Sequence, residues 1–292
     1  MSTNKTYVIL TDSSCDLNRE VLDEWQIGTA SLTFRFDGED KEYTNDGMDI
    51  NEFYSRMKAG GVAKTAAVNT ESFIECFTPY LEGGLDILYI GFSSGLSTTF
   101  NSARLASIEL KEKYPERKII AVDSLCASAG GALLVRLALD KREAGAEIEA
   151  CAEFVESIKL SICHWFTVDD LVYLKRGGRV SSTAAFFGNM LGIKPVMHVD
   201  NEGHLINVAK ARGRRAAVDA LFDKAKSTMI GERANSSVFI SHGDCIEDAE
   251  YLAERIKNEI GVKEVRIAYV GSVIGSHSGP GTLALFFLGS ER

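Results

Sequence analysis

The chain has little that would place it in a membrane or direct it to one. No segment approaches 18 uninterrupted apolar residues, and residues 1–14, MSTNKTYVILTDSS, contain neither a long apolar run nor a small-residue cleavage site. We therefore expect no membrane-spanning helix and no signal peptide, and we expect the protein to be cytoplasmic.

Metal-binding and redox motifs are also missing. The cysteines form no C-x-x-C pair, and the histidines do not recur at the spacing of metal ligands. The sequence therefore predicts reduced, mostly buried thiols and no metal site. The cysteines are Cys15, Cys76, Cys126, Cys151, Cys163 and Cys245, and the histidines are His164, His198, His204, His242 and His277.

Nucleotide and nucleic-acid signatures are absent as well. The chain contains no G-K-S or G-K-T, so it lacks the Walker lysine, and its Ser-rich loop, SSGLST at residues 93–98, is not G-x-G-x-x-G. Lys and Arg number 32 against 41 Asp and Glu, which gives a net charge of −9, and no basic stripe dominates. A nucleoside triphosphate, a dinucleotide or a nucleic-acid partner is therefore not expected.

What is present is the composition of an ordinary folded protein: 292 residues, 45% hydrophobic, with only 4 prolines. Apolar runs of strand length alternate with helical patterns, which predicts an α/β fold with a mostly parallel first sheet. Because the pattern of apolar and polar residues changes near residue 164, we expect two α/β domains, 1–163 and 164–292. Predicted strands in the first are 6–12, 27–36, 86–92 and 118–124; the second includes a helix at 182–192 and a hairpin at 193–213.

Polar residues follow several predicted strands directly. In an open parallel sheet these strand ends share one edge, where ligands bind. The residues are also good helix N-caps, a purely structural role worth about 1 kcal/mol each, and both interpretations stay open. The residues are Asp12, Ser13, Ser93, Ser94, Asp123 and Ser124.

The segment GFSSGLSTTFNSA, residues 91–103, matches G-x-S-x-G around Ser93. One hypothesis is a serine esterase or thioesterase with the chain order Ser93, Asp244, His277. However, the polar run continues past Ser93, whereas a nucleophile elbow needs a tight turn straight into a helix. The favoured hypothesis is an anion site made of hydroxyls and N–H groups at a helix N-terminus, suited to a carboxylate or a single phosphate.

Two further segments could bind an anion. His277 is expected in a Gly-rich loop, GSHSGPG, where its imidazole could donate to a carboxylate oxygen or merely lie at the surface. Arg179 follows a Gly pair in LKRGGRVSS, and Arg212, Arg214 and Arg215 form a second basic cluster. These cations are either ordinary surface charge or a docking face for an acidic or phosphorylated partner.

Taken together, these segments resemble the DegV family from end to end. The resemblance rests on ILTDSSCDL, SSGLSTTFNSARLA, VDSLCASAGGALLV, LVYLKRGGRVS, GIKPVMHVDNEGHL, KARGRRAAVDAL and GSHSGPGTLALFFLG, in that order. It implies a long-chain fatty acid, such as palmitate, stearate or oleate, in a buried tunnel between two α/β domains. It also implies a bacterial carrier that is not itself an enzyme and needs no cofactor.

The resemblance implies a partner and site residues too. The partner is a separate fatty-acid kinase, which makes an acyl phosphate for phospholipid synthesis. The carboxylate would be held by Thr65, by Ser93 or Ser94, and by His277. Arg179, Arg212 and Arg214 would lie near the head group or on the kinase-docking face. Because the segment KTAAVN around Thr65 departs from the family's usual K-T-S-Q-P-S, a member without a kinase partner is a further alternative.

Physical chemistry is compatible with such a ligand. Burying about 14 methylenes at ~0.8 kcal/mol each supplies on the order of 11 kcal/mol, whereas a bare carboxylate cannot be buried. Apolar residues near the polar loops would line the tunnel or simply form core. They are Phe186, Phe187, Met190, Leu191, Phe286 and Phe287.

Overall fold

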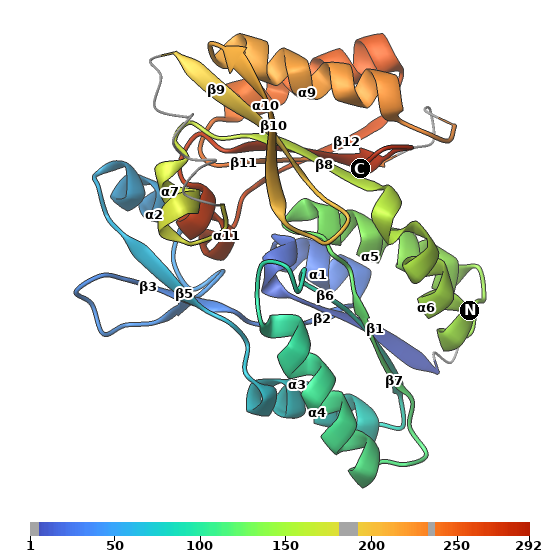
Figure 1. Ribbon diagram of the computed structural model, residues 1–292. Helices are drawn as coiled ribbons and strands as arrows, with labels where there is room; N and C mark the ends of the chain where they lie inside the picture. The colour runs from blue at the N-terminus through green and yellow to red at the C-terminus, as the bar shows by residue number, and fades with distance from the viewer. Residues whose placement is uncertain (1–5, 181–191, 233–236) are drawn as a thin grey trace.

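The computed structural model describes residues 6–180, 192–232 and 237–292 (Figure 1). Its first sheet has the strand order β2-β1-β6-β7, and all three neighbouring pairs are parallel. This confirms the mostly parallel sheet predicted from the sequence. The strands are β1 (Tyr7–Asp12), β2 (Gly28–Ala30), β6 (Asp86–Gly91) and β7 (Ile119–Asp123).

Helices cover both faces of this sheet because successive strand residues point to opposite sides. Ile9 packs into one buried cluster with α5 and α6, whereas its neighbour Leu10 packs into another with α3 and α4. The short α1 adds Trp25 to the first cluster. These helices are α1 (Arg19–Trp25), α3 (Thr70–Glu82), α4 (Thr99–Lys113), α5 (Ala129–Glu143) and α6 (Ile148–Ile158).

A small antiparallel sheet stands beside the first one. It consists of β3 (Thr33–Phe36), β4 (Tyr43–Thr44) and β5 (Ala63–Ala66), with α2 (Ile50–Lys58) following β4. The single strand predicted at 27–36 is therefore wrong: β2 ends at Ala30, and β3 belongs to another sheet. In the segment between β2 and β3, the backbone N–H of Leu32 donates to a side chain, Ser13 Oγ, at 3.0 Å and not to a neighbouring strand. This segment therefore lies between the two sheets.

The second half of the chain forms a six-stranded sheet in the order β10-β9-β8-β13-β11-β12. Within the described strands of this sheet, only the β11–β12 pair is parallel. The hairpin predicted at 193–213 is confirmed as β9 and β10. The strands are β8 (Ile162–Thr167), β9 (Ile193–Val199), β10 (Leu205–Arg212), β11 (Ser237–His242), β12 (Glu264–Tyr269) and β13 (Leu283–Leu288).

Helices α9 (Arg214–Thr228) and α10 (Ile246–Arg255) cover one face of this sheet, and α10 continues as a π-helix over Ile256–Ile260. The other face packs on α5, which contacts strands of both large sheets (Figure 1). The core is therefore continuous between the two halves. The boundary predicted at 163/164 falls inside β8, and the division into two domains stays a prediction.

Two short helices complete the part that surrounds the site: α7 (Val172–Arg176) and α11 (Ser272–Ser278). His277 lies on α11, so its predicted position in a loop is wrong. The glycines of this segment do not prevent the helix from forming, and Gly279 is its C-cap. The helix predicted at 182–192, with Phe186, Phe187, Met190 and Leu191, lies outside the described residues except for Gly192. Within the described ranges, no helix combines the length and apolarity needed to cross a bilayer.

Candidate functional site

A cavity of about 400 Å³ lies where the carboxyl edge of the parallel sheet, helix α11 and the six-stranded sheet meet. Its wall is largely apolar, including Phe92, Leu205 and, as expected from the sequence, Phe286, whereas Phe287 packs in the core under α9 and α10. An apolar cavity of this size with a few polar groups is the usual form of a small-molecule site. Both large sheets contribute to it, so the cavity exists only in the folded whole.

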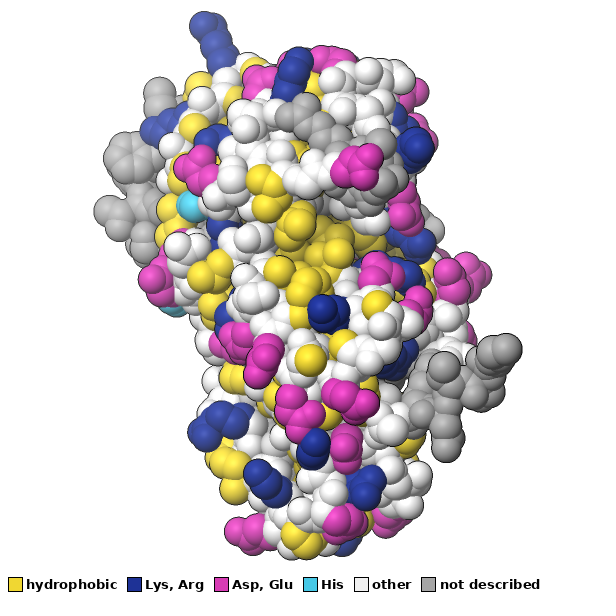
Figure 2. Space-filling model, turned by 90° about the vertical axis from the view of Figure 1, so that its right-hand side faces the viewer, with side chains coloured by type: hydrophobic (Ala, Val, Ile, Leu, Met, Phe, Trp, Pro, Cys, Tyr) yellow, Lys and Arg dark blue, Asp and Glu magenta, His cyan; other side chains and the backbone are white. Residues whose placement is uncertain are grey.

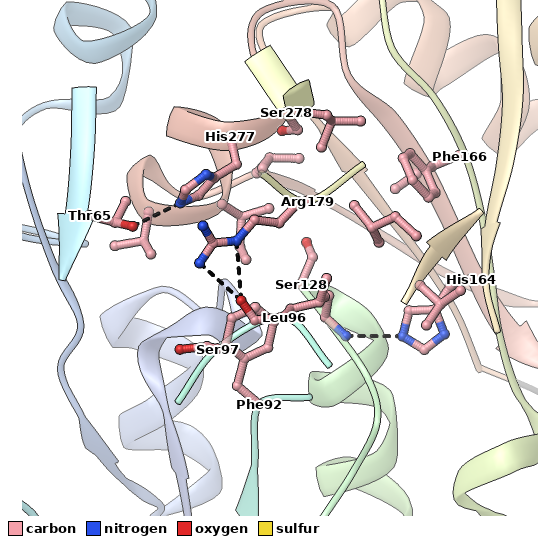
Figure 3. A pocket seen from close by; sticks show the side chains of 18 of the residues that line it. Thr65, Phe92, Leu96, Ser97, Ser128, His164, Phe166, Arg179, His277 and Ser278 are labelled. Atoms are coloured by element: carbon pink, nitrogen blue, oxygen red, sulfur yellow. Dashed lines mark hydrogen bonds between the residues drawn. The ribbon is translucent and has the colours of Figure 1, made fainter. Parts of the chain in front are cut away.

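Thr65 and His277 meet at one end of this cavity (Figure 3). Thr65 Oγ1, on β5, lies 2.8 Å from His277 Nε2, on α11. Burial, reinforced by the positive charge of Arg179, lowers the pKa of His277 to about 4, so the ring is neutral at pH 7. His277 Nδ1 is buried and has no hydrogen-bond partner among the described residues.

These contacts suggest which nitrogen of His277 has the proton. A buried N–H without an acceptor costs more than a buried lone pair without a donor, so we assign the proton to Nε2. His277 then donates to Thr65 Oγ1, and the Thr65 O–H is left to donate elsewhere. An anion in the cavity is the acceptor that this geometry suits.

Arg179 adds a positive charge at the same end. Its Nε and Nη2 donate to the Leu96 carbonyl at 3.2 and 3.0 Å, and its Nη1 donates to the Gly177 carbonyl. The side chain therefore ties the segment after α7 to the Ser-rich loop (Figure 3). Burial lowers the pKa of Arg179 from its usual value, but a guanidinium stays protonated in proteins.

The two candidate serines of the Ser-rich loop differ in whether a ligand in the cavity can reach them. Ser94 is exposed and lines the cavity, and its N–H donates to Asp123 Oδ1 at 3.2 Å. Ser93 is fully buried and is not among the lining residues; its hydroxyl donates to the Gly203 carbonyl at 2.9 Å. Of the pair, Ser94 is the one that a ligand can reach.

The hydrolase triad suggested by chain order is not assembled among the described residues. Ser93 is bonded to Gly203, and His277 is bonded to Thr65. Asp244 forms an ion pair with Lys58. No hydrogen bond joins the three proposed members within the described ranges. Ser93 also lacks the positive φ that a nucleophile elbow imposes on its serine.

The second basic cluster lies away from the cavity wall. Arg212 is exposed, and Arg214 is paired with Asp248 at 2.8 Å and lies 3.7 Å from Asp169. Arg215 stacks over Tyr251. Only Arg179 of the predicted cations lines the cavity, and a docking role for Arg212 and Arg214 stays a prediction.

The aspartates predicted at the strand ends have mainly structural contacts. Asp12 is buried and accepts hydrogen bonds from Ser14, Tyr89 and the Phe92 amide. It caps the short 3-10 helix that follows β1, as the structural interpretation expected. Among the described residues no cluster of potential metal ligands occurs.

Ser128 and His164 are among the polar lining residues that sequence reasoning missed. His164 Nε2 accepts from the Ala127 amide at 3.2 Å, and its Nδ1 lies 2.8 Å from the Ile162 carbonyl. Burial holds the pKa of His164 well below its usual value, so the ring is neutral. Figure 3 shows Ser128 between this histidine and the Thr65–His277 end. His164 lies in the strand segment ICHWF, and nothing in this local pattern indicates that its histidine lines a cavity.

The surface adds one electrostatic observation. Figure 2 shows a face on which acidic and basic side chains are interspersed, while hydrophobic ones gather in a hollow near its middle. No single sign of charge dominates that face. The expectation that no nucleic acid binds stays a prediction.

Comparison with known proteins identifies close relatives. The family model described as "Uncharacterised protein, DegV family" matches residues 6–290. A DegV domain-containing protein of Clostridium perfringens is 42% identical over 292 residues, 99% of each chain. A Thermotoga maritima protein named "Fatty acid-binding protein" is 32% identical over 94% of this chain and 95% of its own. A solved stearic acid-binding protein from Eubacterium ventriosum is 25% identical, with a TM-score of 0.86 over 97% of this chain and 98% of its own.

These matches agree with the observed architecture. The family model spans all three sheets and every cavity residue named above. The Clostridium and Thermotoga relatives both exceed 30% identity over more than nine tenths of the chain. The chain belongs to the DegV family.

Proposed function

We propose that the cavity binds a long-chain fatty acid of the palmitate, stearate or oleate class, with the carboxylate at the Thr65–His277 end. The observation that carries this proposal is the asymmetry of the cavity: hydrogen-bond donors and a guanidinium lie at one end, and the wall beyond them is mostly apolar, with Ser128 and His164 as polar exceptions. Apolar burial drives a chain into such a space, and the carboxylate needs donors because it cannot be buried bare. The stearic acid-binding neighbour and the fatty acid-binding relative support the same ligand class.

Each polar group has a role in this proposal. The Thr65 hydroxyl and the Ser94 hydroxyl donate to the carboxylate, and neutral His277 orients Thr65 through its Nε2–H. Arg179 supplies the positive charge while it holds the Ser-rich loop through the Leu96 carbonyl. Ser93 supports the loop from behind through its bond to Gly203.

The second part of the proposal is presentation. In the cytoplasm, the bound acid offers its carboxylate to a separate fatty-acid kinase, and the resulting acyl phosphate feeds phospholipid synthesis. This protein then acts as a carrier and not as the phosphorylating enzyme. The exposed position of Ser94 supports access to the carboxylate, because a phosphoryl donor must reach one of its oxygens.

Native mass spectrometry of the freshly purified protein, followed by solvent extraction, tests the ligand. We expect one fatty acid per chain, which the extraction identifies by length and unsaturation. A protein that arrives empty and also fails to take up added stearate would overturn the proposal. Phosphorylation of the bound acid by a purified fatty-acid kinase, compared with free acid alone, tests the second part.

A further inference from the structure

Ser128 has a strained backbone at the turn from β7 into α5. Its φ of 52° and ψ of −146° lie where residues other than glycine are rare, at a cost of about 1–3 kcal/mol. Such strain persists only where the surroundings hold it, and it occurs often at functional sites. A serine strained at a strand-to-helix turn is the defining geometry of a nucleophile elbow. The sequence pattern pointed to Ser93, but this geometry occurs at Ser128.

The hydroxyl of Ser128 has a carboxylate partner. Ser128 Oγ donates to Asp16 Oδ2 at 2.5 Å and also lies 3.2 Å from Ser241 Oγ, and all three residues are buried. The other oxygen, Asp16 Oδ1, has no hydrogen-bond partner of good geometry among the described residues, and lies beside Gly271 and Asn45. Asn45 is itself fixed, because it donates to the Ser13 carbonyl at 3.0 Å and accepts from the Val273 amide at 2.9 Å. Among the described residues, the one hydrogen bond of good geometry to this carboxylate therefore comes from Ser128.

Ser128 also lies where an acyl group would be. It lines the cavity, between the Thr65–His277 end and His164 (Figure 3). It directly precedes α5, a helix of 15 residues. The Gly130 and Gly131 N–H groups donate to the carbonyls of Ala127 and Ser128, which leaves the N–H of Ala129, the residue after Ser128, as the donor for an acyl oxygen. A backbone N–H directly after an attacking serine can stabilise the oxyanion. The nucleophile and one oxyanion donor are thus adjacent residues at the cavity wall, and the base comes from the distant residue Asp16.

We propose that Ser128 is a nucleophile with Asp16 as its general base, and that the cavity also accepts long-chain acyl thioesters and hydrolyses them slowly. This activity goes beyond the carrier function. It rests on that function in one respect: the cavity must accept an acyl chain.

The reaction has two balanced steps. Ser128 Oγ attacks the thioester carbonyl carbon, its proton passes to Asp16, the C–S bond breaks, and the departing thiolate takes that proton from Asp16. The product is an acyl ester on Ser128 and a free thiol. Water then attacks this ester, its proton passes through Asp16 to Ser128 Oγ, and the fatty acid is released. No oxidant or cofactor is consumed.

The choice of a thioester follows from the histidines of the cavity. His277 is neutral and occupied by Thr65, and both nitrogens of His164 have backbone partners. Neither is placed to protonate a poor leaving group such as an alkoxide. A thiol, with a pKa of about 8.5, leaves without that help.

The proposed base, Asp16, should make the acylation rate depend on pH. Burial raises the pKa of Asp16 to about 7, and only its ionised form accepts the proton from Ser128. The titratable groups that face it are Asp12 and Cys15 from its own segment and Tyr54 from α2, and none of them is a cation. The acylation rate should therefore rise with pH through neutrality.

An alkyl fluorophosphonate with a long chain tests the nucleophile, with intact-mass and peptide analysis as the readout. We expect one adduct per chain, on Ser128, and none in Ser128→Gly, which relieves the backbone strain and so keeps the fold. Asp16→Asn should slow labelling at least tenfold and remove its pH dependence. Ser227→Ala, on the exposed face of α9, is the matched control and should label like the parent chain.

Stearate binding is measured on the same samples, and hydrolysis is measured with the stearoyl thioester of N-acetylcysteamine. A chain that binds stearate but gains no adduct, or gains it on Ser93 or another residue, overturns the dyad and leaves the carrier function intact. A chain that labels on Ser128 but binds no stearate overturns the carrier function instead. Labelling of Asp16→Asn at the parent rate would remove Asp16 as the base.

Discussion

Thr65 and His277 are 212 residues apart in the chain, and their side chains meet at 2.8 Å. One comes from an edge strand of the small sheet and the other from α11, which follows the last strand but one of the large sheet. The pair brings a free hydroxyl donor to the end of an apolar cavity. The proposed carboxylate site depends on this contact more than on any single motif.

The head-group assignment predicts a large effect from a double substitution. In Ser94→Ala with His277→Ala, stearate should dissociate at least tenfold faster and bind about 10–100-fold more weakly, because hydrogen bonds to a charged group contribute about 1.5–3 kcal/mol. Fluorescence displacement and stopped-flow dissociation measure both quantities. The exposed Ser157→Ala is the control, and thermal unfolding confirms that the fold is kept. Unchanged retention in the double variant would remove the assignment.

The neutral state of His277 predicts a pH-dependent stability. Its folded pKa of about 4 lies below the unfolded value of 6.5, so the unfolded chain takes up the proton first as the pH falls. The contribution of His277 is therefore present above pH 6.5 and is lost as the pH falls toward 4, by ~3 kcal/mol relative to a non-titrating residue.

Urea unfolding of the parent chain and of His277→Gln between pH 4 and 7.5 measures this difference. Asp16, whose pKa is raised, has the opposite slope, but it is present in both chains and cancels in the comparison. If the two stability curves run parallel over that range, the pKa of His277 is the same in the folded and the unfolded chain, and burial does not hold its ring neutral.

The Ser-rich loop contacts the β9–β10 turn, so we expect a side chain at Gly203 in that turn to destabilise the protein. A Cβ at Gly203, where φ is +81°, would lie 2.1 Å from Ser93 Oγ. Gly203→Ala should destabilise the chain through both backbone strain and this clash, by about 2–3 kcal/mol. Gly38→Ala is the matched control, since Gly38 has φ +83° with no atom within 4 Å of an added Cβ. Equal losses in chemical denaturation would mean that only the strain matters.

The continuous core predicts that residues 1–163 and 164–292 depend on each other. Phe166, Phe239 and Phe286 of the large sheet belong to the same buried cluster as Ile9 of the parallel sheet and Leu133 of α5. Fragment 1–163 should therefore lack a cooperative thermal transition, whereas the whole chain shows one. Calorimetry of the fragment and the whole chain checks this, and a sharp transition in the fragment alone would show that the first half folds independently.

Much of the fold follows from local patterns. Apolar periodicity predicts the parallel sheet and the hairpin at 193–213, because it reports which side of an element is buried, and the structure confirms both. The split between β2 and β3 was not predictable in this way. An apolar run shows strand-like residues, but it does not show which partner strand each of them pairs with.

The candidate site, like the fold, is only partly predictable from the sequence. The sequence by itself determined the family, the residue types of an anion-binding end, and Thr65, Ser94, Arg179 and His277 as candidates for it. Only the tertiary structure decided that Ser93 donates to Gly203, that Ser128 donates to Asp16, and that His164 lines the cavity. The physical reason is that a side chain's partner depends on contacts between segments far apart in the chain. Local propensity contains no information about those contacts.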